Sequence, residues 1–217
     1  EDAGKTADGI LTALSSPEPL ATAGERHANW WREFWSRTHI DVKTPDGTGE
    51  QALHDRQIFL YHLASSSRGA YPPKWNGSIF VGQGDERGWG SQYWLWTMEM
   101  LYWPLHAADA SDLAAPFFDL YRKALPAMHI AARQRWDASG FFLPETMPFD
   151  GPTVLPESLV ELYRERFLRD PGGAELSPRL VAHCKYDWHL EATTTRRERT
   201  ELGYSWIGHL ASSGAEL

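Results

Sequence analysis

The stretch QYWLWTMEMLYWPLHAA, residues 92–108, decides the class of fold. It places apolar side chains on every side of a helix, and a helix of that kind is buried all round. The segments around it also repeat apolar side chains at intervals of three and four residues, which indicates amphipathic helices. The sequence therefore predicts an all-α protein with this helix in its interior.

On either side of that helix, the spacing predicts further helices over residues 24–38, 49–66, 111–136, 156–168 and 178–202. Ser111 is expected to cap the long helix at 111–136, and Pro126 is expected to bend it. A turn is predicted at residues 44–47 (TPDG), and residues 78–81 are the best candidate for a strand. The core side chains expected from this spacing are Leu53, Leu60, Leu63, Ala64, Leu113, Phe117, Leu120, Ala124, Met128 and Ala131.

The composition of the chain excludes several classes of function. The chain has 217 residues and a net charge of −8, which argues against a nucleic-acid partner because that affinity rests on a basic surface. One cysteine excludes an internal disulfide and a zinc site built on thiolates. We expect no metal, no cofactor and no membrane span, and we favour a secreted or periplasmic location over the cytoplasm.

Tryptophan is frequent, with 11 residues, and two of them, Trp75 and Trp89, lie in a long loop at residues 67–91. Loops of that length are uncommon unless they are functional or disordered. Indole rings serve either as core filler or as flat platforms for sugar rings. We interpret the loop as part of a ligand site, with contacts from residues in and near it: Arg68, Trp75, Asn76, Asp85, Arg87, Trp89, Tyr93 and Trp96.

Two carboxylates lie in apolar surroundings. Glu99 falls inside the helix at 92–108, where an unpaired charge is costly, so it forms an ion pair with an arginine such as Arg68 or Arg87, is protonated, or faces a cleft. Glu145 follows FFLP, whose desolvation is expected to raise its pKa as a general acid requires, or else it braces a loop or caps a helix. Asp150, before Gly151, is either a turn residue or a third polar contact.

Other catalytic patterns are absent from the sequence. The segment GQG at residues 82–84 does not fit a phosphate loop, since two acids follow it and no lysine does. No HExxH and no GxSxG motif occurs. A pair of acids with aromatic platforms is the arrangement that glycoside hydrolysis uses.

Several segments together resemble a known family. They are SSSRG at 65–69, PPKWNGSIF at 72–80, WGSQYW at 89–94, YWP at 102–104 and FLPET at 142–146. Over residues 25–155 they resemble the (α/α)6 barrels of bacterial six-hairpin glycosidases, in particular family 95-type α-L-fucosidases and an uncharacterised sister group. The resemblance implies a toroid of paired helices with long irregular loops, and sugar bound where those loops converge.

The chain departs from that family at residues 95–97 (LWT), where the fucosidases carry asparagines that position the water-activating machinery. A full barrel has twelve helices and follows a β-sandwich. We therefore expect a fragment, with residues 1–23 as a short helix and linker and residues 24–217 as a partial barrel. Apolar faces left open in a half-barrel predict self-association.

Three functions follow from these features. The first is a glycoside hydrolase-like domain acting on a plant or microbial polysaccharide or oligosaccharide, with Glu145 and Glu99 as its acid/base pair. The second is a non-catalytic carbohydrate-binding or scaffold domain. The third is a helical interaction protein whose tryptophans are core.

Overall fold

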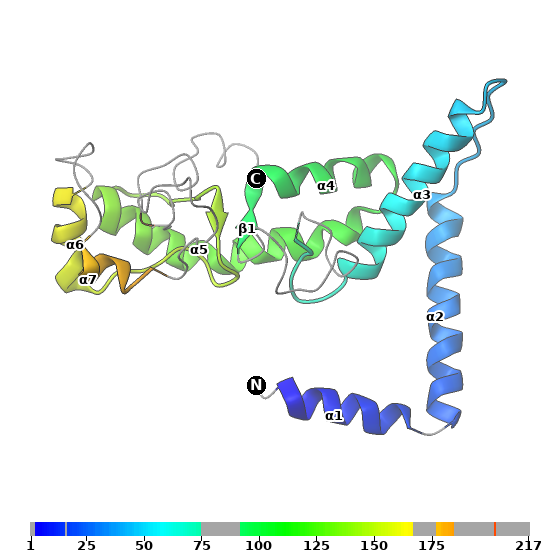
Figure 1. The fold of residues 1–217 in the computed structure, drawn as a ribbon, viewed down its shortest axis with the longest axis horizontal. Coiled ribbons are helices and arrows are strands. Elements are labelled where there is room, and N and C mark those ends of the chain that lie inside the picture. The colour runs from blue at the N-terminus through cyan, green and yellow to red at the C-terminus, as the bar shows by residue number, and fades with distance from the viewer. Residues whose placement is uncertain (1–2, 16, 75–91, 167–176, 185–201, 203–217) are drawn as a thin grey trace. The chain divides into compact units, whose positions relative to one another are not determined.

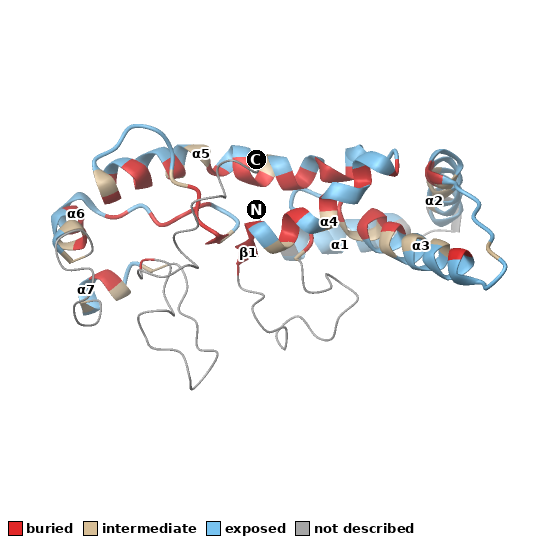
Figure 2. Ribbon diagram, turned by 90° about the horizontal axis from the view of Figure 1, so that it is seen from above, coloured by how far each residue is buried: buried red, intermediate tan, exposed pale blue. Residues whose placement is uncertain are grey.

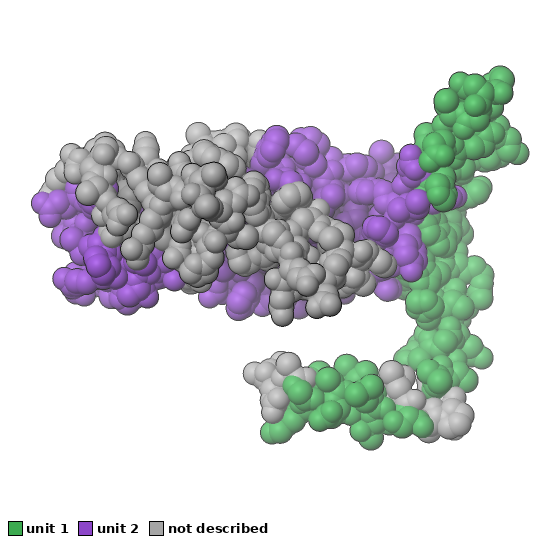
Figure 3. All heavy atoms as spheres, in the orientation of Figure 1, with its two compact units in different colours: residues 1–54 green, residues 55–217 purple. Residues whose placement is uncertain are grey.

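The computed structural model describes residues 3–15, 17–74, 92–166, 177–184 and 202. These residues are mostly helical, as the apolar spacing predicts (Figure 1). The chain divides into two compact units, Glu1–His54 and Asp55–Leu217 (Figure 3). The expected strand at residues 78–81 and most of the expected helix at 178–202 lie outside the described residues.

The first unit contains α1 (Ala3–Leu14), α2 (Pro17–Thr38) and the start of α3 (Thr48–Ser66). Helix α2 runs through residue 23, where the sequence predicts the end of a linker. Its aromatic side chains pack on one another: Phe34 is 1% exposed, and its ring stacks on Trp30 with centroids 5.2 Å apart. The aromatic spacing therefore predicts this helix correctly, although its start lies earlier.

The turn predicted at residues 44–47 is confirmed. The Gly47 amide donates to the Thr44 carbonyl over 3.1 Å, and Gly47 has a φ of 79°, which glycine adopts without strain. Asp46 then caps α3, because its Oδ1 accepts hydrogen bonds from the Thr48 amide at 3.2 Å and the Thr48 hydroxyl at 2.8 Å. Hydrogen bonds from the Thr44 and Thr48 hydroxyls lower the pKa of Asp46 to about 2.

The second unit is built from the end of α3, then β1 (Tyr93–Trp94), α4 (Leu95–Ala107), η3 (Ser111–Ala114), α5 (Ala115–Trp136), β2 (Thr146–Met147), α6 (Glu157–Arg164) and α7 (Pro178–Val181). Strands β1 and β2 pair antiparallel, with Tyr93 opposite Met147. The sequence predicts helix at 93–94 and loop at 146–147, so both assignments are wrong. Strands of two residues carry no readable alternation.

Helix α5 forms the core of the second unit (Figure 2). All six apolar side chains expected on the face of residues 111–136 are buried. The prediction of Ser111 as the helix cap is wrong: residues 111–114 form a separate short helix, and Ser111 Oγ lies 2.9 Å from His106 Nδ1 instead. The expectation that residues 92–108 are buried all round is also wrong, because Trp96 is 50% exposed and Trp103 is 60% exposed.

The segment at residues 141–156 lies along α5 and is held there by polar contacts. Gln134 binds Leu155 twice: its Nε2 donates to the Leu155 carbonyl at 2.7 Å, and its Oε1 accepts from the Leu155 amide at 2.8 Å. Arg135, which is 1% exposed, lies over the rings of Phe142 at 4.5 Å and Tyr163 at 5.7 Å. These contacts join the segment that carries Glu145 to α5 and α6.

Candidate functional site

Glu145 lies at the start of α4, although it belongs to a segment about fifty residues further along the chain. It directly precedes β2, and the strand pairing brings it to the N-terminal end of the helix. The Leu95 amide donates to the Glu145 carbonyl at 2.8 Å, and the Trp96 amide donates to Glu145 Oε2 at 3.3 Å. Glu145 therefore satisfies two of the amides that open α4, an arrangement suited to an ionised carboxylate. These contacts are those expected of a helix cap, which is one of the interpretations of Glu145 that the sequence leaves open.

Glu99 lies one turn further along α4 and faces the interior of the second unit. Its side chain is 3% exposed, and that of Glu145 is 2% exposed. Of the two arginines predicted as ion-pair partners, Arg68 is exposed in the bend after α3. Arg87 lies outside the described residues. With 2% and 3% of their surfaces exposed, both candidate carboxylates are buried, and both belong to the second unit.

Tyr121 of α5 is buried in the same unit, and both carboxylates affect its pKa. It is 4% exposed, and its pKa is raised well above the usual value, first by burial and then by electrostatic repulsion from nearby ionisable groups: Glu145, Tyr102, Glu99 and Tyr93. Its phenol therefore stays protonated and keeps its donor hydrogen at any physiological pH. Within the described parts of the chain, no group accepts a hydrogen bond from the Tyr121 hydroxyl.

Two further tyrosines and a serine extend this buried cluster. Tyr102 hydroxyl lies 3.3 Å from Ser67 Oγ, which also donates to the Leu113 carbonyl at 2.7 Å. The Tyr93 hydroxyl donates to the Pro72 carbonyl at 3.3 Å, and Lys74 Nζ lies 4.1 Å from the centre of its ring. Burial raises the pKa of Tyr93 to about 12 and raises that of Tyr102 further. These phenols are neutral hydrogen-bond donors as well.

The sequence pattern misses Tyr121, Tyr102 and Ser67 as members of the cluster. Tyr121 follows Phe117 by four residues and precedes Ala124 by three, so it lies on the predicted apolar face of its helix. A phenol on that face, with a hydroxyl that needs a partner, is the signal that identifies it.

The remaining predicted contacts divide into three groups. Tyr93 is buried in the cluster, whereas Arg68, Trp96 and Asp150 are exposed. Trp96 reaches Glu145 through its backbone amide, while its indole ring is half exposed. Five predicted contacts lie outside the described residues: Trp75, Asn76, Asp85, Arg87 and Trp89.

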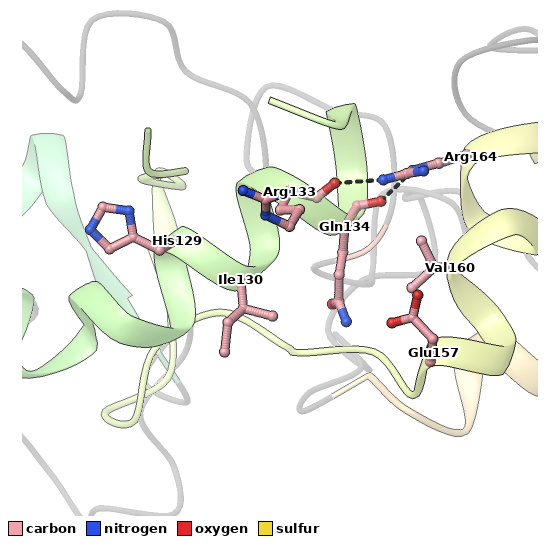
Figure 4. A pocket seen from close by; sticks show the side chains of 7 residues that line it. All are labelled: His129, Ile130, Arg133, Gln134, Glu157, Val160 and Arg164. Carbon is pink, nitrogen blue, oxygen red and sulfur yellow. Dashed lines mark hydrogen bonds between the residues drawn. The ribbon is translucent and has the colours of Figure 1, made fainter. Parts of the chain in front are cut away.

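A separate groove of about 270 Å³ lies between α5 and α6 (Figure 4). Two of its polar side chains already form hydrogen bonds within the protein: Gln134 binds Leu155, and Arg164 donates to the carbonyls of Gln134 at 2.8 Å and Arg133 at 2.6 Å. Arg164 thereby satisfies carbonyls at the C-terminal end of α5. None of the predicted site residues lines this groove, which includes His129, Ile130, Glu157 and Val160.

Compared with known protein families, with curated proteins and with solved structures, the chain shows no match. Among the helices of the described residues, none is long and apolar enough to cross a membrane. Over the same part of the chain, no three His, Cys, Asp or Glu side chains gather where they would hold a metal ion.

Proposed function

We propose that this chain is the helical part of a glycoside hydrolase, a partial (α/α)6 barrel in which Glu145 and Glu99 are the working carboxylates. One observation carries the proposal. Two buried acids from distant segments, Glu145 directly before β2 and Glu99 on α4, both raise the pKa of the buried phenol of Tyr121. Glycoside hydrolysis uses such a pair, one acid to protonate the leaving oxygen and one carboxylate to activate water or attack carbon.

The contacts suggest how the two roles divide. The Trp96 amide and the N-terminal end of α4 stabilise negative charge on Glu145. In the proposal Glu145 is therefore the ionised carboxylate, in place of the general acid that its apolar neighbours suggest. Glu99 supplies the proton, and the protonated Tyr121 donates a hydrogen bond to the sugar or to the attacking water.

A non-catalytic carbohydrate-binding or scaffold domain is the second candidate. The observation that favours it is the burial of both carboxylates, at 2% and 3% exposed, together with the role of Glu145 as a cap of α4. In that case the acids stabilise the helix start and the interior. A saccharide would then bind without being cleaved.

The test measures turnover and binding in the same preparations. The chain, Glu145→Gln and Glu99→Gln are incubated with aryl glycosides, the α-L-fucoside and β-galactoside first. Thermal melts with fucose and galactose report binding. Glu157→Gln, which removes an exposed acid from α6, is the matched control. Far-UV circular dichroism verifies that each variant is folded.

The hydrolase predicts turnover that falls by about a thousandfold in both site variants and is unchanged in Glu157→Gln. A raised melting temperature without turnover selects the binding domain. If no saccharide is cleaved and none shifts the melt, both functions are wrong.

A further inference from the structure

The outer face of α4 carries a regular apolar stripe. Its members are Trp96, Met100, Trp103 and Ala107, which repeat at intervals of four, three and four residues. Trp96 is 50% exposed, Met100 41% and Trp103 60%, and Ala107 is exposed as well. Large apolar side chains spaced in this way form one face of a helix and are the pattern by which helices pair.

The stripe is uncharged on a chain whose net charge is −8. Of the exposed side chains of α4, His106 is the one that can ionise, and its Nδ1 lies 2.9 Å from Ser111 Oγ. An acidic chain repels its own copies over most of its surface. The stripe is a place where two copies approach without bringing like charges together.

We propose that a second copy of this chain covers the stripe, through antiparallel pairing of two α4 helices about a two-fold axis. The order of side-chain sizes supports this arrangement. With the axis between residues 101 and 102, Trp96 lies opposite the partner's Ala107, and Met100 lies opposite the partner's Trp103. Each indole then meets a smaller or a flexible side chain, which allows close packing. A two-fold interface of this kind is self-complementary.

The exposed area sets the strength of the pairing. The two half-exposed indoles and Met100 offer roughly 300–400 Å² in each copy, against a total of about 1,200–2,000 Å² in stable interfaces. Two copies together would therefore bury about 600–800 Å², which is below that range, so the dimer is expected to be weak and to depend on concentration. The pairing is independent of the proposed activity, because it uses the outer face of α4 and leaves Glu99 inside.

Sedimentation equilibrium between about 1 µM and 1 mM measures the association of the unmodified chain. We expect a dimer at the upper end and a monomer at the lower end. Trp103→Glu and Met100→Lys each bury a charge in the seam, so each should weaken association by at least about tenfold. Phe118→Glu, on α5, is the matched control: Phe118 is 45% exposed and lies outside the stripe, so association should not change.

Mixing the two charged variants tests orientation. Antiparallel pairing sets position 100 against the partner's position 103, so an equal mixture of Met100→Lys and Trp103→Glu should recover association that neither variant shows alone. A parallel pair would leave each charge opposite an apolar residue, and the mixture would stay monomeric.

Circular dichroism checks that the variants are folded. If an introduced charge disrupts α4, the uncharged variants Met100→Ser and Trp103→Ser replace the two charged ones. Three results overturn the proposal: a monomer at every concentration, a dimer that Phe118→Glu weakens and the stripe variants do not, or a mixture that fails to recover. A monomer whose tryptophan fluorescence responds to saccharides assigns the stripe to sugar instead.

Discussion

Replacing Gln134 by leucine removes the link that fastens the Glu145-bearing segment to α5. Gln134 is 9% exposed and makes two hydrogen bonds with Leu155, at 2.7 Å and 2.8 Å. Leucine has nearly the same volume, so the substitution tests the polar contacts and not the packing. The Leu155 amide and carbonyl lose their partners while Leu155 itself stays 3% exposed.

The magnitude follows from those two groups. A buried backbone donor or acceptor left without a partner costs about 1–3 kcal/mol, and the apolar leucine recovers part of that cost. We expect the free energy of unfolding of the second unit to fall by about 2–4 kcal/mol. Urea unfolding followed by circular dichroism measures the fall. Hydrogen exchange of peptides that span residues 148–160 locates it.

Gln134→Glu separates the donor from the acceptor. Its carboxylate keeps the acceptor for the Leu155 amide, but it loses the donor to the Leu155 carbonyl unless it is protonated. The folded state therefore favours the protonated form and raises the pKa of this group above the unfolded value of about 4.3. The variant should be most stable below that value and lose stability as the pH rises through the folded-state pKa.

Two results would refute this reasoning. The first is a Gln134→Leu variant whose free energy of unfolding changes by less than about 0.5 kcal/mol, the range of ordinary surface substitutions. The second is a Gln134→Glu variant whose stability rises from pH 4 to pH 7 relative to the unmodified protein.

Two further predictions concern the backbone at Gly151 and the side-chain carboxylate of Asp46. Gly151 has a φ of +88°, and a Cβ there would lie 3.1 Å from Ala124 Cβ, so Gly151→Ala should lower the free energy of unfolding by about 1–3 kcal/mol. Gly140→Ala is the comparison: Gly140 has a φ of +103° and no neighbour within 4 Å of an added Cβ, so that variant should show the effect of backbone strain without crowding. An equal loss of unfolding free energy in both variants would contradict the crowding at Gly151. Asp46, with a pKa lowered from 3.8 to about 2, should stabilise the start of α3 above pH 4 and lose that effect as the pH falls toward 2. Exchange of the Thr48 amide measured by NMR should follow this titration, and a profile that Asp46→Ala leaves unchanged would assign the effect to another group.

Helix faces could be read from the sequence because helical spacing is a local property. The buried face of α5, with Phe117, Leu120 and Ala124, follows directly from intervals of three and four residues. The turn before α3 follows from Asp46 and Gly47, whose preferences act within four residues. Both features need no information about distant parts of the chain.

The candidate site depends on contacts across about fifty residues. Glu99 and Glu145 stand out in the sequence because each lies among apolar neighbours, but the position of Glu145 at the start of the helix that carries Glu99 depends on the pairing of Tyr93 with Met147. That pairing involves strands of two residues, which are too short to show any alternation. For the same reason the capping of α4 by Glu145 is visible only in the fold.

The outer stripe of α4 shows the limit of the local pattern most clearly. Composition and spacing are enough to show that residues 95–107 lie in an apolar helix. Only the tertiary structure decided which side of that helix is covered. Burial depends on which other segments reach a surface, and they left Trp96, Met100 and Trp103 exposed.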